Sequence, residues 1–153
     1  MKKYELTAEF IEKWGKKLFR IKALISFGSV EAGKLGGYVE KEDNLAQDGD
    51  AWVYGDARVC GDAWVCGDAD YLLIDRIGSR FSFTTFFKNK DKGITVSCGC
   101  FLGTIAEFRA KVTDTHGNNK HAKMYNLAAD MAELQILGEE HFDKLNTNKS
   151  EPF

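Results

Sequence analysis

A six-residue unit repeats four times between Gly49 and Leu72, reading GDAWVY, GDARVC, GDAWVC and GDADYL. A fixed short period is typical of a solenoid, in which each repeat packs only against its neighbours. A period of six predicts a left-handed parallel β-helix, in which each unit forms one face of a coil. The position that points into this coil is expected to hold Val53, Val59, Val65 and Tyr71.

Residues beside the inward position are expected on the outer surface of the coil. Large exposed aromatics commonly mark an interface, so we interpret Trp52, Arg58 and Trp64 as contacts with another subunit or with the C-terminal region. The flat faces of a β-helix favour self-association, and we expect a homo-oligomer, either a dimer or a trimer. Cys60 and Cys66 should lie on different faces, which argues against a metal site between them.

The sequence on both sides of the repeats predicts elements that close the coil. Residues 1–28 contain a hairpin with its turn at Trp14 and Gly15, and residues 29–76 form the β-helix. Residues 77–138 form an α+β cap, and residues 139–153 a flexible tail. The expected fold class is mainly β with an α+β cap: a short left-handed parallel β-helix, then a β-hairpin and two helices.

The α+β cap starts with alternating strands and continues with helical patterns. Residues 80–87 and 94–98 predict a hairpin around a polar loop. Thr104 and Glu107 form a capping box that predicts the start of one helix, and a second helix is predicted over residues 119–137. Its buried stripe is predicted to consist of Met124, Leu127, Ala128, Met131 and Leu134.

Composition narrows the range of partners. The formal net charge is −2 and the isoelectric point is about 5.9, so the chain lacks the basic field that non-specific nucleic-acid binding needs. No apolar run approaches the roughly 18 residues that span a membrane, so no membrane partner is expected. We interpret the four cysteines as reduced thiols, which predicts a cytoplasmic location.

Three segments resemble a known group of proteins. The stretches RIKAL, FGSVEAGKLGGYVEKEDNL and GDAWVYGDARV resemble a family of uncharacterised phage and prophage proteins with hexapeptide repeats, over residues 4–75. The resemblance implies a phage-related origin, the cytosol of the host cell as location, and a left-handed β-helix. It implies no catalytic residue.

Enzymes built on β-helices provide a second test of function. Acyltransferases and carbonic anhydrases of this architecture use histidines on or beside the coils. Here His116, His121 and His141 all lie beyond the repeats, which predicts a protein without catalytic activity, cofactor or metal. Cys98 and Cys100 superficially suggest a thiol or metal site, but they lack CxxC spacing, and we interpret them as buried structural thiols.

One set of residues in the C-terminal half predicts a ligand site. Basic groups there could pair with phosphate or carboxylate, and aromatic rings could stack on a base. The alternative is a solvated strand face beside a polar turn between two helices. The residues of this predicted site are Arg80, Thr84, Phe86, His116, Asn119, Lys120 and Tyr125.

The sequence therefore favours a non-enzymatic, phage-derived binding protein. It would counteract host defence by sequestering a nucleotide signal or by blocking a host defence protein. Two other functions remain open: a polymer-forming or virion-associated structural protein, and a β-helix transferase with its site between subunits.

Overall fold

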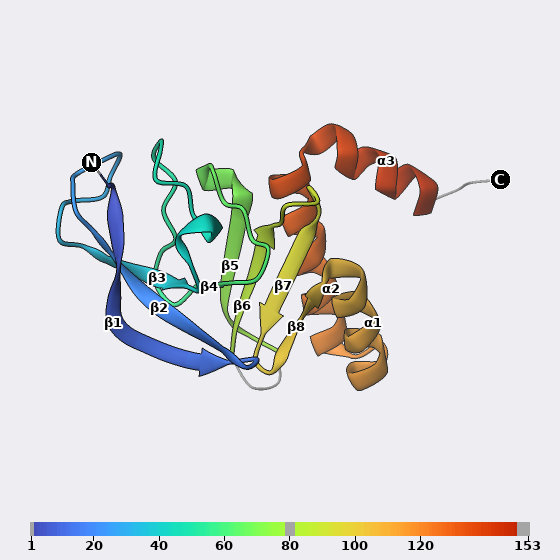
Figure 1. Ribbon diagram of the computed structural model, residues 1–153. Helices are drawn as coiled ribbons and strands as arrows, with labels where there is room; N and C mark the ends of the chain where they lie inside the picture. Colours follow the sequence, from blue (N-terminus) through green and yellow to red (C-terminus); the bar gives the residue numbers. More distant parts are fainter. Residues whose placement is uncertain (1, 79–81, 150–153) are drawn as a thin grey trace.

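A computed structural model describes residues 2–78 and 82–149. It contains two four-stranded sheets and a set of helices at the C-terminal end (Figure 1). The first sheet has the order β1-β2-β3-β4, and the second has the order β5-β6-β7-β8. The strands are β1 (Tyr4–Lys13), β2 (Lys16–Ala23), β3 (Leu35–Val39), β4 (Arg58–Val59), β5 (Tyr71–Ile77), β6 (Ser82–Lys88), β7 (Ile94–Cys98) and β8 (Phe101–Thr104).

The second sheet lies between the N-terminal unit and the helices (Figure 1). Both of its faces are therefore covered. Successive residues of a strand point to opposite faces, and in β6 both Phe86 and Phe87 are fully buried. Phe87 packs in the N-terminal core cluster with Trp52, whereas Phe86 packs with the helices.

The predicted N-terminal hairpin is present. β1 and β2 pair antiparallel with Lys13 opposite Lys16. Between them, Trp14 and Gly15 both have positive φ, at 54° and 72°. A two-residue turn with positive φ at both positions matches the right-handed twist of the strands that it joins.

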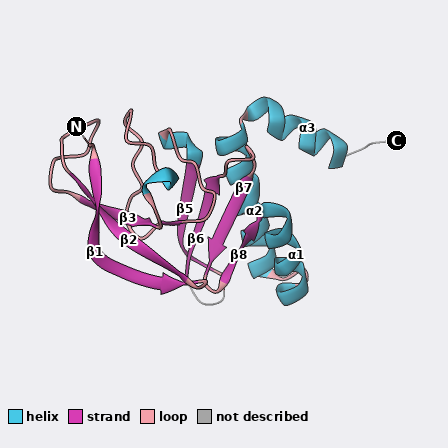
Figure 2. Cartoon of the chain, in the orientation of Figure 1, coloured by secondary structure: helices cyan, strands magenta, loops and turns pink. Residues whose placement is uncertain are grey.

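The predicted left-handed β-helix is wrong. The repeat stretch is largely loop (Figure 2), and most pairings in the two sheets are antiparallel. β4 pairs in parallel with β3, and one parallel bridge joins Leu45 to Val65. Within the described residues no stack of parallel strands builds a solenoid. Four hexapeptides supply little more than one turn of coil, and a solenoid needs neighbouring turns to bury its interior.

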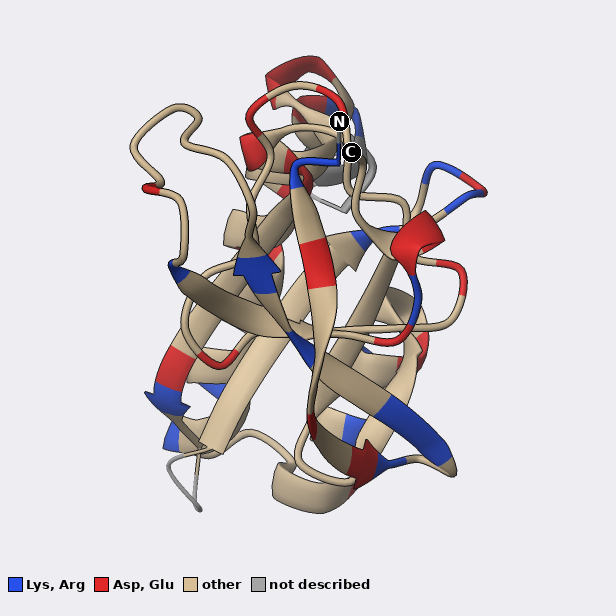
Figure 3. Cartoon of the chain, turned by 60° about the vertical axis from the view of Figure 1, so that its left-hand side comes forward, with Lys and Arg blue, Asp and Glu red and all other residues tan. Residues whose placement is uncertain are grey.

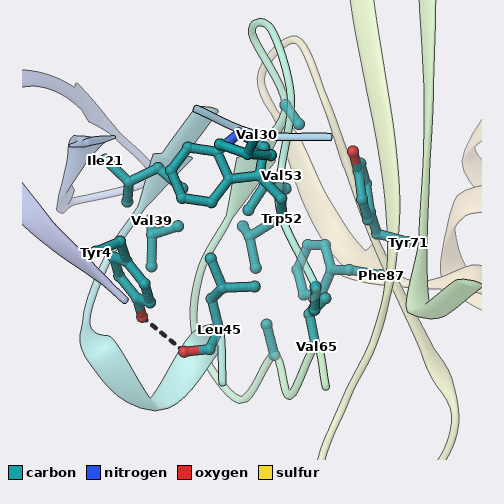
Figure 4. Packing of buried hydrophobic residues seen from close by; sticks show 14 of the residues in the cluster. Tyr4, Ile21, Val30, Val39, Leu45, Trp52, Val53, Val65, Tyr71 and Phe87 are labelled. Carbon is teal, nitrogen blue, oxygen red and sulfur yellow. Dashed lines mark hydrogen bonds between the residues drawn. The ribbon is translucent and has the colours of Figure 1, made fainter. Parts of the chain in front are cut away.

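The inward positions of the repeats are nevertheless buried. Val53, Val59 and Val65 are all inaccessible to solvent. They pack in a cluster around Trp52, next to Tyr4 and Leu45 (Figure 4). The Tyr4 hydroxyl donates a hydrogen bond of 2.6 Å to the Leu45 carbonyl. The repeats thus fill the space between the two sheets instead of enclosing a core of their own.

Two polar side chains hold the repeat loops in place. Asn44 is fully buried, and its amide donates to the carbonyls of Gly61 and Ala63 at 2.9 and 3.2 Å. Arg20 of β2 donates to the Gly36 carbonyl of β3 at 2.7 Å, and it reaches the repeats at the Gly55 carbonyl and the Asp56 carboxylate, both at 3.5 Å. These bonds satisfy backbone groups that a regular ladder would otherwise pair.

The helices follow the second sheet and cover its outer face. The capping box is confirmed: the Thr104 hydroxyl accepts from the Glu107 amide at 3.2 Å, and the Glu107 carboxylate accepts from the Thr104 amide at 2.8 Å. The predicted β6–β7 hairpin and both predicted helices are also present. The helical segments are α1 (Ile105–His116), α2 (Lys120–Ala132), a π-helical turn (Glu133–Leu137) and α3 (Glu139–Lys149).

Two details of the helical region differ from expectation. The segment expected to be a flexible tail contains α3, which extends from the body of the molecule (Figure 1). In α2, Ala128 is buried, but the large members of the predicted core stripe are exposed. In the described part of the chain, no helix is long and apolar enough to cross a membrane.

Charged residues of both signs are interspersed along the N-terminal hairpin (Figure 3). Salt bridges there join opposite charges, as between Arg20 and Glu9 at 3.0 Å. This face therefore presents no continuous basic stripe, which agrees with the low net charge of −2.

Candidate functional site

A cavity of about 280 Å³ lies between the β7–β8 turn and helices α1 and α2. β7 and β8 are joined by Gly99 and Cys100, and Gly99 has φ of 56°, which permits the tight turn. This turn places Cys98 and Cys100 at the cavity wall. Cys100 is exposed and Cys98 is half-buried.

Helix α1 provides the opposite wall. Phe108 and Val112 point inward and are buried, whereas Lys111 and His116 reach the rim. Phe101 of β8 packs against Phe108, with ring centroids 5.7 Å apart. The wall is therefore apolar with basic groups at its edge, which is the usual composition of a small-molecule site.

Tyr125 of α2 forms the floor. Its ring stacks on His116 with centroids 5.9 Å apart and 26° between the planes. Its hydroxyl lies 3.9 Å from the Cys98 sulfur and 3.4 Å from the Ile77 carbonyl, to which it donates. A Cβ at Gly78 would collide with this hydroxyl, so glycine is required there.

The electrostatics of the floor favour neutral groups. Burial raises the pKa of Tyr125 to about 12, and the neighbouring Cys98 adds to the rise. The Thr84 hydroxyl donates to the Cys98 sulfur at 3.2 Å. At physiological pH the phenol therefore keeps its proton and acts as a hydrogen-bond donor.

Only part of the predicted ligand site comes together. His116 and Tyr125 line the cavity, whereas Arg80 lies outside the described residues. Thr84 and Phe86 are fully buried in the second sheet, and neither lines the cavity.

The remaining two predicted ligand residues belong to the start of α2. Asn119 is the N-cap: its side-chain oxygen accepts from the Ala122 amide at 3.0 Å. Lys120 is exposed in the first turn of the helix. Neither residue lines the cavity.

Sequence reasoning missed Cys98, Cys100, Lys111 and Phe101 as cavity residues. It assumed that the two cysteines lie on one continuous strand and point the same way. The Gly99–Cys100 turn breaks the strand between them. The glycine of the Cys98-Gly99-Cys100 motif was the available signal, because glycine between two short strands indicates a turn.

The predicted contact residues also separate. Trp52 is fully buried, with ring centroids 5.4 Å from Phe27. The Arg58 guanidinium lies 5.3 Å from the centre of the Phe83 ring, while 43% of Trp64 is exposed. Of the three, Trp64 is the one that offers a large apolar surface to a partner.

Metal binding receives no support from the described residues. Among them, no group of three or more His, Cys, Asp or Glu side chains is placed to hold a metal ion. Cys60 and Cys66 are both free thiols, the first buried and the second exposed.

Comparison of the sequence with known protein families and with curated proteins finds no match. The site must therefore be interpreted from its own geometry.

Proposed function

We propose that this is a non-enzymatic binding protein that holds a small, planar, negatively charged molecule in the cavity between the β7–β8 turn and helices α1 and α2. The observation that carries the proposal is the composition of the walls. Apolar surface from Phe101, Phe108 and Val112 lies beside the basic groups Lys111 and His116.

The size and chemistry of the cavity favour a ligand with one ring system. A volume of about 280 Å³ lies at the small end of the range for ligand pockets. A base or similar ring would lie against the apolar wall, and a phosphate or carboxylate would pair with Lys111. Thr115 and Ser82, which also line the cavity, add hydroxyl groups. A mononucleotide matches this pattern better than a larger nucleotide does.

The biological role that we propose is sequestration of a nucleotide-type signal. It is supported by the resemblance to phage and prophage proteins, which favours action in the cytosol of an infected cell against host defence. The alternative of a structural polymer relied on a β-helix, which this fold lacks.

Calorimetric titration with 5′-ribonucleoside monophosphates tests the proposal. Adenosine and inorganic phosphate serve as probes for each half of the ligand. We expect at least one monophosphate to bind, and Lys111→Ala to weaken that binding about 10-fold or more, because a charge-assisted hydrogen bond is lost. Lys90→Ala, at an exposed lysine in the β6–β7 loop, should bind like the original protein.

Thiol labelling locates the bound molecule. Cys100 lines the cavity and Cys66 does not, and both are exposed. A bound nucleotide should slow labelling of Cys100 and leave Cys66 unchanged. The proposed function is wrong if no monophosphate binds. It is also wrong if a monophosphate binds Lys111→Ala as tightly as the original protein and does not slow the labelling of Cys100.

A further inference from the structure

Helix α2 presents a row of large apolar side chains to solvent. Met124, Leu127, Met131 and Leu134 are exposed to 39%, 65%, 52% and 43%. The row continues from α2 into the π-helical turn that follows it. We call these four residues the α2 ridge.

The ridge reverses the usual arrangement of an amphipathic helix. The side of α2 that packs on the sheet carries mainly alanines, with Ala128, Ala129 and Ala132 all buried. A helix normally directs its largest apolar groups to the core. The space between the second sheet and the helices is already filled by Phe86 of β6 and Phe108 of α1, whose ring centroids lie 5.7 Å apart. Small residues therefore suffice on the inner side of α2.

The spacing of the ridge fits packing against another helix. Its members are separated by three, four and three residues. This is the spacing of the apolar seam in a pair of helices whose side chains interlock. Asp130, on the flank, is paired with Arg109 of the same chain at 2.7 Å, so it does not place a free charge beside the seam.

The charges at the ends of the ridge identify the partner helix. Lys120 and Lys123 are exposed at the N-terminal end, and Glu139 and Glu140 are exposed just beyond the C-terminal end. The surface is therefore basic at one end and acidic at the other. It complements a copy of itself turned end to end, and two such copies are related by a two-fold axis.

We infer that the α2 ridge is the interface of a homodimer in which the α2 helices of two copies pack antiparallel. Met124 of one copy then meets Leu134 of the other, and Leu127 meets Met131. The same pairing brings the lysines of each copy to the acidic end of its partner. This interface is independent of the proposed ligand cavity.

Sedimentation of the full chain over a range of concentrations tests the inference. We expect a monomer–dimer equilibrium that Leu127→Glu shifts to monomer, because a buried unpaired charge opposes association. Leu127 is largely exposed, so the thermal midpoint of the monomer should change little. Leu35→Glu, at a leucine exposed to 50% on β3, is the matched control and should dimerise normally.

A charge exchange tests the antiparallel arrangement. Lys120→Glu with Lys123→Glu should weaken the dimer, as should Glu139→Lys with Glu140→Lys. One variant is acidic at both ends of the ridge and the other is basic at both ends, so an equimolar mixture brings opposite charges together at both ends and should form a heterodimer. All four changes in one chain should also restore association, because the basic and acidic ends are then exchanged in both copies. A chain that stays monomeric up to its solubility limit, or a dimer unaffected by Leu127→Glu, would overturn the inference.

Discussion

Gly36 lies where the backbone of β3 passes close to the repeat loops. A Cβ at this position would lie 2.7 Å from the Val53 carbonyl oxygen and 2.7 Å from the Trp52 ring. The backbone oxygen cannot move without breaking its hydrogen bond with the Gly37 amide, which is 2.8 Å long. The close contact between strand and loops therefore depends on the absence of a side chain.

Gly36→Ala should lower the free energy of unfolding by about 1–3 kcal/mol, the usual penalty for overpacking a core. Urea denaturation measures the change. Gly67→Ala is the matched control, since Gly67 has ordinary φ and the nearest atom to its added Cβ would be 3.9 Å away. Equal stability of the two variants would contradict this account of β3 packing.

At the residue scale, the sequence correctly predicted that the repeat valines are buried, but it placed Trp52 on the wrong side. The inward valines of the repeats are buried as expected, because apolar side chains that recur at a fixed position of a repeat share one buried face. Trp52 was expected outside and is fully buried. The alternation that assigns it to the outer face holds only for an extended strand, and residues 51–54 form none.

Helices α1 and α2 are joined by one arginine. Arg109 of α1 donates to the Asn126 side chain at 3.1 Å and to the carboxylates of Asp130 and Glu133 at 2.7 and 2.5 Å. Only 9% of the Glu133 side chain is accessible. Without the guanidinium this carboxylate would be buried and unpaired.

Arg109→Ala should therefore destabilise the protein by about 2–3 kcal/mol. Adding Glu133→Leu should recover part of the loss, because the second change removes the unpaired charge and fills its space. Urea denaturation of both single variants and the double variant measures the coupling. Strictly additive effects would show that the pair does not join the helices.

At the element scale, signals that depend on neighbouring residues were reliable. The Trp14–Gly15 turn and the capping box at Thr104 are set by local backbone chemistry, and both are present. The buried side of α2 was not predictable in the same way. Periodicity shows that a helix has an apolar stripe, but not whether the stripe meets its own sheet or another surface.

At the scale of the whole molecule, the prediction of a β-helix was wrong because the number of repeats matters as much as their period. A hexapeptide pattern specifies which residues turn inward, yet a solenoid also requires coils above and below. Here two antiparallel-rich sheets supply the covering surfaces instead. The cavity could not be foreseen either, since it forms between a turn and two helices that only the packing of the second sheet brings together.

Each of the three core clusters contains at least one ionisable group whose pKa is raised by burial, and in the N-terminal cluster Tyr4 is a second such group beside Tyr71. Tyr71 lies in the N-terminal cluster, Tyr125 in the helical cluster and Cys60 in the cluster with Leu18 and Tyr38. Burial is the main cause that raises the pKa of each of these three groups to about 12. Their ordinary values are 10.0 for tyrosine and 9.0 for cysteine.

These shifts predict a loss of stability at alkaline pH. Above about pH 9 the unfolded chain releases these protons, while the folded chain retains them until about pH 12, so the folded state binds more protons. Stability is therefore fully present below about pH 9 and falls as the pH rises toward 12. Urea midpoints measured across this window should decline steadily, and the whole molecule should be affected, because all three clusters contribute.

Tyr71→Phe separates one contribution from the others. The variant loses the bond that the Tyr71 hydroxyl accepts from the Tyr54 amide at 3.0 Å, so it should be less stable near neutral pH. It should also show a shallower decline with rising pH, since phenylalanine cannot ionise. A decline equally steep in Tyr71→Phe would mean that the buried phenol does not couple ionisation to folding.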